Sequence, residues 1–152
     1  MKKPFYFLWR QPGGLDECPY FKRTVLGFRN WSVRVHEWYA DDDTRNMHDH
    51  PHWFWTIVLR GGYTDVSANG EDRMRFGSIR FRRADYAHAV TKVIPGSITV
   101  LVTGPSTRRW GFWVNGKLIK RDKYFAVHGH HPCDSGDAPV RLKPGGARIN
   151  NT

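Results

Sequence analysis

Cysteines and long apolar runs are scarce in this sequence. Cys18 and Cys133 are the only cysteines among 152 residues, too few for a disulfide framework, and we expect both thiols to be reduced. No apolar run approaches the ~20 residues that span a bilayer. The first ten residues hold two lysines and a short aromatic stretch that Arg10 ends, which is too short for a secretory signal. We therefore expect a soluble, cytoplasmic protein with no membrane partner.

Motifs of several common function classes are also missing. The sequence has no phosphate-cradling Gly-x-x-x-x-Gly-Lys loop and no dinucleotide fingerprint. It has no Gly-x-Ser-x-Gly nucleophile elbow, no pair of Cys-x-x-Cys motifs and no helical DNA-reading motif. These absences argue against a nucleotide-binding enzyme, a serine hydrolase of that type and a zinc-ribbon or helix-turn-helix protein.

Acidic residues are outnumbered by basic ones. Aspartate and glutamate total 14 against 24 lysines and arginines, which gives a formal net charge of +10. Such a balance favours an anionic partner: a small carboxylate or phosphate substrate, or nucleic acid. The charge does not choose among these partners, and a merely solvated basic surface stays an alternative.

Alternation of apolar and polar residues is frequent, whereas helical periodicity is poor. The run 31–39 alternates like a half-buried strand. Asn69-Gly70 and Asn115-Gly116 are signals for two-residue hairpins. Further strands are expected at 21–28, 56–59, 63–67, 72–76, 78–82, 88–93, 97–103, 109–114 and 117–121. Short strands separated by regular turn signals predict an all-β sandwich or barrel.

Composition divides the chain into one domain and a tail. Hydrophobic residues make up 39% and aromatic residues 14%, enough for a packed core. We expect a single domain over residues 1–128, opening with a short irregular or helical segment that includes a helix near 15–21. Residues 129–152 are rich in proline and glycine, which predicts an irregular tail.

Three histidines occupy alternate positions at 48, 50 and 52. Alternate side chains of an extended chain share a face, so His48 and His50 can converge on one point. Neutral imidazoles suit Zn, Cu, Fe and Ni, and Mn when oxygen ligands join them. Pro51 disturbs the extended geometry, which makes His52 a candidate neighbour of the site as well as a candidate ligand. Asp49 should point away from the ligands, from where it could orient an imidazole.

The spacing of these residues resembles the cupin family over roughly residues 30–115. The first cupin motif is a His-x-His pair followed by a glutamate and a glycine, and His48, His50 and Gly61 match it, with Phe54 at the glutamate position. The second motif runs from a glycine to a histidine, and Gly77 and His88 match it. Arg83 and Asp85 replace its proline and its second glycine.

The resemblance implies a fold, a metal and a ligand set. The fold is the double-stranded β-helix, or jelly-roll barrel. The ligands carried over are His48, His50 and His88, and they imply a divalent metal, with Fe(II) preferred and Zn, Mn or Ni open. Two alternatives remain: histidines that only pack with satisfied nitrogens, and a metal-free cupin that uses them for hydrogen bonds.

Several other side chains are candidates for the lining of such a barrel. Arg80 and Arg82 share one face of a strand, opposite Ile79 and Phe81. If they point inward they can clamp a carboxylate or phosphate; if outward they form only a basic surface. Trp55 is a candidate stacking platform or a core residue. Tyr63 and Thr99 are candidate polar lining. The histidine-rich stretch 128–134 is either an exposed loop or a cover for the barrel.

Two classes of function follow. The first is a metal-dependent enzyme acting on a small anionic substrate, with dioxygenase-type oxidation preferred and redox-neutral isomerase or hydrolase chemistry as the variant with another metal. The second is a non-catalytic cupin that binds a sugar, a nucleotide or a small acid. The sequence leaves the oligomeric state open, and a homodimer that pairs an edge strand such as 31–39 across a two-fold axis is one alternative.

Overall fold

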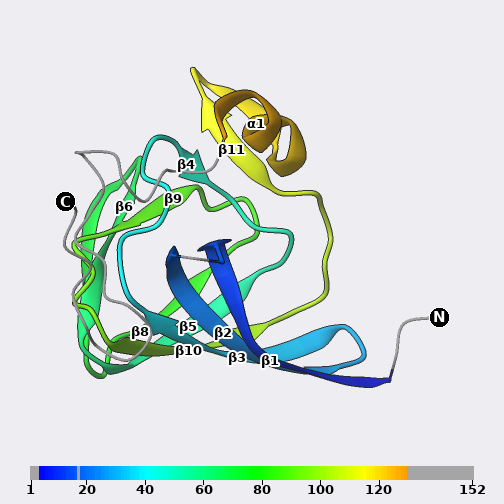
Figure 1. Ribbon diagram of the computed structural model, residues 1–152, viewed down its shortest axis with the longest axis vertical. Helices are drawn as coiled ribbons and strands as arrows, with labels where there is room; N and C mark the ends of the chain where they lie inside the picture. Colours follow the sequence, from blue (N-terminus) through cyan, green and yellow to red (C-terminus); the bar gives the residue numbers. More distant parts are fainter. Residues whose placement is uncertain (1–3, 17, 130–152) are drawn as a thin grey trace.

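Two antiparallel sheets pack face to face in a computed structural model that describes residues 4–16 and 18–129 (Figure 1). Sheet A contains, in spatial order, β1 (Phe5–Leu15), β2 (Cys18–Phe28), β3 (Trp31–Trp38), β10 (Ser97–Thr103), β5 (Phe54–Arg60) and β8 (Ile79–Arg82). Sheet B contains β12 (Lys117–Lys120), β11 (Gly111–Val114), β4 (Met47–His48), β9 (His88–Thr91), β6 (Gly62–Ser67) and β7 (Gly70–Arg75). The helix α1 (Arg121–His128) follows β12. The expected all-β jelly roll is confirmed.

The apolar core lies at one end of the space between the sheets. Trp38 and Val58 from sheet A pack there against Tyr63, Met74 and Val90 from sheet B. The candidate site lies in the same inter-sheet space, where polar side chains line the cavity together with Phe54, Trp110 and Phe112.

The crossing from sheet A to sheet B after β5 depends on two glycines. Gly61 has a φ of +67°, which glycine adopts without strain. A Cβ on Gly62 would lie 2.2 Å from the carbonyl oxygen of Met74. Gly61, the glycine of the first motif, therefore marks the corner at which the chain changes sheets.

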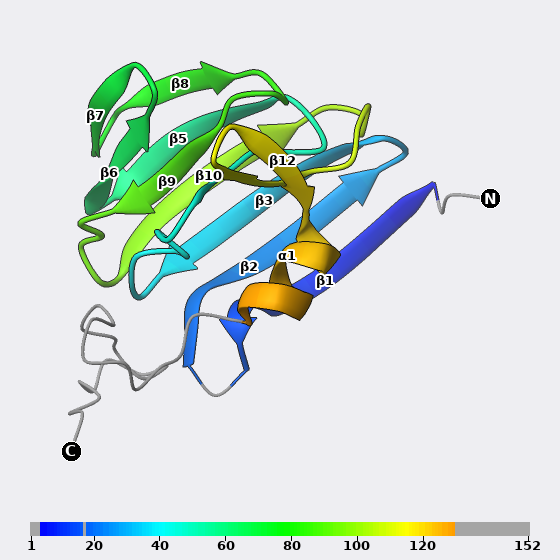
Figure 2. The ribbon, with the colours of Figure 1, turned by 90° about the horizontal axis from the view of Figure 1, so that it is seen from above.

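The N-terminal expectation was wrong. The segment expected to be irregular, with a helix near 15–21, instead forms β1 and the first residues of β2, whereas the strand expected at 21–28 is present as the rest of β2. The two strands make a long hairpin beside β3 (Figure 2). Its glycines and prolines indicated loops, but Pro12, Gly13 and Gly14 lie within β1, where register shifts between Leu8 and Gln11 and between Gly13 and Gly14 accommodate the irregularity.

Some of the other expectations are confirmed and some are wrong. Both asparagine-glycine hairpins form, between β6 and β7 and between β11 and β12. The run 31–39 is no edge, because β3 lies between β2 and β10. The two-residue strand β4 and the helix α1 were not predicted. The helix packs on sheet B through Tyr124, whose ring centroid lies 3.9 Å from that of Phe112 in a stacked arrangement. The helix is too short and too polar to cross a membrane. The expected tail lies outside the described residues from position 130 onward.

Candidate metal centre

Three histidines meet at one point between the sheets. His48 ends β4, His50 follows it in the next loop, and His88 begins β9. His48 and His88 are paired in register, which is the one register pair between β4 and β9. One ring nitrogen from each of the three residues lies within 4.8 Å of the others, and His88 is buried. The sequence-predicted ligands are therefore brought together by strand pairing and a single extended loop.

A carboxylate fixes the orientation of His88. The Nδ1 of His88 lies 2.9 Å from Oδ1 of Asp65 on β6. An ionised carboxylate only accepts hydrogen bonds, so Nδ1 donates and the lone pair of Nε2 is left for the cluster. Asp65 is held in turn by Arg82, whose Nη2 donates to Oδ2 at 3.3 Å, and by the hydroxyl of Tyr86 at 3.3 Å. His48 has a similar neighbour, since its Nδ1 lies 3.7 Å from Oδ2 of Asp42.

The donor set fits a divalent metal. Burial, reinforced by His88, holds the pKa values of His48 and His50 well below their usual range, so both rings are neutral near pH 7 and keep their lone pairs. Nε2 of His88 and Nε2 of His50 lie 3.3 Å apart. Two imidazole nitrogens bound to one ion at ~2.1 Å lie ~3.0–3.4 Å from each other at tetrahedral or octahedral angles. The observed separation of this pair meets that requirement, and the donor nitrogen of His48 lies within 4.8 Å of the other two.

Phe54 fills the place of the glutamate in the first cupin motif. Its side chain is buried and its ring centroid lies 4.4 Å from that of His50. The residue therefore packs on a ligand and cannot ligate. The protein donors of the cluster, among the described residues, are three imidazoles.

Asp49 points away from the cluster, as expected, and fastens the loop that carries it. Its carboxylate is fully buried and accepts from Nη1 of Arg108 at 2.6 Å, the backbone N–H of Gly111 at 2.9 Å and Nε1 of Trp113 at 3.2 Å. These bonds tie the segment between the two ligands to β11. Asp49 makes no contact with an imidazole, so it positions the ligands through the backbone.

The cluster opens onto a cavity of about 630 Å³ between the two sheets. Tyr63 and Thr99 line this cavity, and both are buried. The hydroxyl of Thr99 accepts a hydrogen bond from Nε1 of Trp38 at 3.0 Å. His52 also lines it, outside the three-histidine cluster, and burial lowers its pKa to about 4. Side chains from both sheets therefore enclose the space in front of the candidate ligands.

Three sequence candidates lie away from this cavity. Trp55 projects from the outer face of sheet A, 44% exposed and 5.3 Å from Phe81, because its neighbour Phe54 takes the inner position. Arg80 donates to Asp72 at 2.8 Å. Arg82 faces the opposite sheet, where Asp65 and Asp72 neutralise it. The expected arginine clamp for a substrate is therefore not formed by these two residues.

Sequence reasoning missed a polar wall on sheet A. Arg23 of β2 and Arg34 and His36 of β3 line the same cavity. The signal was present, since Arg34 and His36 alternate with Val33 and Val35. The valines were the natural choice for the interior, yet Val33 is exposed and His36 is buried. In the stretch 128–134, His128 packs on Tyr124 at the end of α1, and the residues from 130 onward lie outside the described part of the chain.

No protein-family model and no curated protein matches the sequence. Solved structures do match the fold. KdgF from Halomonas sp. superposes with a TM-score of 0.51 at 15% identity, over 67% of this chain and 95% of that one. A structure of the DMSP lyases RdDddP and RnDddQII gives 0.52 at 18% identity, over 66% and 58%. FeII HppE gives 0.50 at 18% identity, over 68% and 58%, so this chain spans little more than half of the length of the last two. The two antiparallel sheets, matched by these structures, show that the chain has the cupin fold.

Proposed function

We propose that this protein is a metal-dependent enzyme that holds Fe(II) on His48, His50 and His88 and oxidises a small anionic substrate with dioxygen. The observation that carries the proposal is the convergence of three imidazoles on one side of a cavity. When bound, Fe(II) supplies Lewis acidity and redox chemistry. The structure of FeII HppE, which shares the fold, supports the choice of iron.

The residues of the chain prepare the site for this chemistry. Three neutral ligands leave the full charge of a divalent ion uncompensated, which favours an anionic group of the substrate beside it. Phe54 has no donor atom for a metal, so a fourth protein ligand is missing at this position and more of the coordination sphere stays free for substrate and oxidant. Asp65 keeps His88 in one tautomer, and Asp49 fixes the loop between His48 and His50.

A redox-neutral reaction is the second candidate. A DMSP lyase is among the structures with this fold, and three imidazoles also suit Zn, Mn or Ni. The identity of the metal that the protein takes up separates the two candidates.

The test is metal loading of the untagged protein. Metal-free protein is incubated anaerobically with Fe(II), Zn(II), Mn(II) or Ni(II), desalted and analysed for metal content. His48→Ala, His50→Ala and His88→Ala are the variants, and His128→Ala, an exposed histidine on α1, is the matched control. We expect about one equivalent of Fe(II) in the wild type and the control, and none in the three variants.

Nitric oxide then probes whether the iron has a free position for a diatomic oxidant. We expect the Fe(II)-loaded protein to give the EPR signal of a high-spin iron-nitrosyl complex, without any knowledge of the substrate. Uptake of zinc, nickel or manganese but not iron would favour the redox-neutral candidate. Uptake of no metal would overturn the enzyme proposal and leave a ligand-binding barrel.

A further inference from the structure

A group of cationic and polar side chains lines the sheet A wall of the cavity without an acidic partner. Arg23 and His36 are cross-strand neighbours in the register of β2 and β3, and Arg34 lies two residues from His36 on the same face. His52 completes the group from the loop after His50. All four side chains therefore face the space onto which the three candidate ligands open.

The hydrogen-bonding capacity of this group is largely unused. Both ring nitrogens of His36 lack a partner, although 93% of the residue is buried. Nε of Arg23 and Nδ1 of His52 also lack one. Arg34 donates through Nε to the hydroxyl of Ser32 at 2.9 Å. Buried polar groups are normally satisfied, so four orphaned nitrogens on one cavity wall indicate a missing acceptor.

The charge of the group is also uncompensated. Elsewhere in the described chain the buried arginine contacts are paired, as in Arg82 with Asp65 and Arg108 with Asp49. Within residues 4–16 and 18–129, Arg23 and Arg34 form no ion pair with a carboxylate. Burial, with the charge of nearby Arg23 as the second cause, lowers the pKa of Arg34 to about 10. Burial, followed by both arginines, lowers the pKa of His36 to about 3.

We propose that Arg23, Arg34 and His36, with His52 beside them, bind an oxyanion of the substrate, a carboxylate or a phosphate. This inference rests on the proposed function in placing the reacting end of that substrate at the three-histidine cluster. Guanidinium groups match the geometry of such oxyanions, and their N–H bonds to them are charge-assisted. The substrate class is then a small molecule with an oxyanion at one end and a metal-directed group at the other.

The test uses oxyanions as probes, because the substrate is unidentified. Inorganic phosphate and succinate are titrated into the full chain by isothermal calorimetry, with Arg23→Met and Arg34→Met as variants. Arg60→Met is the matched control, since Arg60 is an exposed arginine of sheet A whose Nε donates to the carbonyl of Gly96. We expect each of the two variants to weaken binding of at least one probe by about tenfold or more, and the control to bind like the wild type.

Two further arms keep the result interpretable. Thermal unfolding without anion reports folding: methionine in place of an unpaired, desolvated arginine should leave the midpoint unchanged or raise it. His88→Ala separates the two proposals, because oxyanion binding that survives this substitution in a protein that takes up no metal supports the wall site alone. Loss of binding only in His88→Ala, or equal binding by Arg23→Met, Arg34→Met and Arg60→Met, would overturn the assignment and leave an adventitious ion only.

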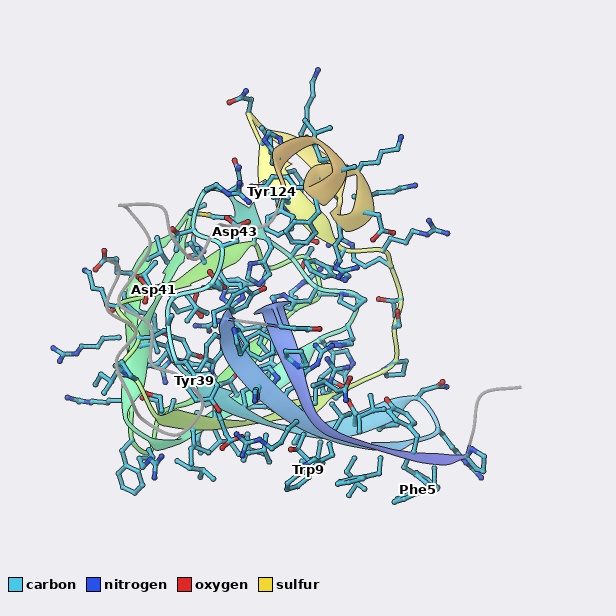
Figure 3. The ribbon with its side chains drawn as sticks, viewed as in Figure 1. Phe5, Trp9, Tyr39, Asp41, Asp43 and Tyr124 are labelled. Atoms are coloured by element: carbon cyan, nitrogen blue, oxygen red, sulfur yellow. The ribbon has the colours of Figure 1, made fainter. Side chains whose placement is uncertain are left out.

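A second inference comes from the opposite face of sheet A. One register row runs across all six strands as Phe7, Leu26, Val33, Val102, Trp55 and Phe81. Most of these side chains, with others beside the row, are exposed to solvent. Phe5 and Trp9 point away from the barrel on this side (Figure 3). Along this row apolar side chains thus face solvent, while the inner face of the sheet carries Arg23, Arg34 and His36 as well as its core residues.

The exposed apolar area on the outer face of sheet A is close to the area that one partner buries in a standard protein–protein interface. Seven aromatic side chains of this face are 44–66% exposed: Phe5, Phe7, Trp9, Phe28, Trp31, Trp55 and Phe81. At ~200 Å² for each ring system, about half of it exposed, the aromatics alone present ~700 Å². A standard interface buries ~800 Å² per partner, and contiguous apolar patches on monomers rarely exceed a few hundred Å².

We infer that a second copy of this chain covers this face, sheet against sheet, about a two-fold axis. An isologous dimer requires an apolar, self-complementary surface. The register row carries no charged residue, so two copies of this chain, each with a net charge of +10, would not bring like charges together along it. This dimer forms through the face of sheet A and not through β3 as an edge.

Analytical ultracentrifugation of the full chain tests the dimer. We expect the wild type to sediment as a dimer at micromolar concentration, and Phe7→Lys and Trp55→Lys to sediment as folded monomers. Phe76→Lys, which replaces an exposed phenylalanine in the turn between β7 and β8, should remain dimeric. A monomeric wild type, or a dimer that both face substitutions leave intact, would refute the inference.

Discussion

Replacing Asp49 by asparagine tests whether the loop between the candidate ligands is held by its buried carboxylate. The substitution keeps the shape of the side chain and removes its charge. The charge-assisted bond from Arg108, at 2.6 Å, is worth ~1.5–3 kcal/mol, and turning an amide NH₂ toward the N–H of Gly111 or Trp113 leaves a buried donor unpaired at ~1–3 kcal/mol. We expect a loss of about 3 kcal/mol in the free energy of unfolding.

Thermal unfolding measures this loss. In a domain of about 150 residues, 1 kcal/mol shifts Tm by ~2–4 °C, so Asp49→Asn should unfold ~6–12 °C below the wild type. Asp85→Asn is the matched control, because Asp85 also accepts from an arginine, Arg83, but at an exposed site. The control should unfold at the wild-type temperature.

A double-mutant cycle with Arg108→Met assigns the loss to the ion pair. If the pair carries the effect, Asp49→Asn costs less once Arg108 is absent, by more than ~1 kcal/mol. A Tm for Asp49→Asn within 2 °C of the wild type, or strictly additive effects in the cycle, would refute the reasoning that Asp49 anchors this loop.

Three further predictions concern ligand orientation, acid stability and the sheet corner. Asp65→Asn should weaken metal affinity ~10–100-fold in a competition titration, because the tautomer of His88 is no longer fixed, and unchanged affinity would contradict that role. His36→Phe should make the protein less sensitive to acid. A folded pKa of about 3 against 6.5 in the unfolded chain means that stability is complete above pH 6.5 and falls as the pH drops toward 3. The wild type should therefore lose about 2 kcal/mol more than His36→Phe between pH 7 and pH 5 in urea titrations, and equal losses would contradict the assignment. Gly62→Ala should lower Tm markedly or prevent folding, because the added Cβ would collide with the carbonyl oxygen of Met74. Gly70→Ala is the control, since a Cβ there meets nothing within 4 Å and only its φ of +111° is unfavourable. Equal unfolding midpoints for the two variants would show that the corner relaxes.

The strands and the candidate ligands were predictable because their signals are local. Alternation and asparagine-glycine turns indicated most strands, and the spacings from His48 to Gly61 and from Gly77 to His88 matched the two histidine motifs. The long N-terminal hairpin was not predictable, since its prolines and glycines are accommodated by register shifts that depend on the partner strand.

The orientation of sheet A was the larger obstacle. Burial of apolar residues predicts that Val33, Trp55 and Phe81 face inward, yet all three are exposed while His36 and Thr56 are buried. Within one chain this inverts the usual pattern of a half-buried strand. A polar cavity on one side and an apolar contact surface on the other explain the inversion, but neither can be recognised from the periodicity of a single strand.

The two-residue strand β4 makes the candidate metal centre the narrowest seam of sheet B. β12, β11 and β4 on one side are joined to β9, β6 and β7 on the other by the single register pair of His48 and His88. A seam of one pair is the part of a sheet that opens most easily, so amide hydrogens around positions 47–50 should exchange faster than those of β10, which is paired on both sides over its length. An ion bound by both histidines would hold β4 and β9 together. The free energy of local opening would then rise by the free energy of ion binding, and the amides would exchange more slowly. Hydrogen exchange at these amides would therefore report the occupancy of the centre.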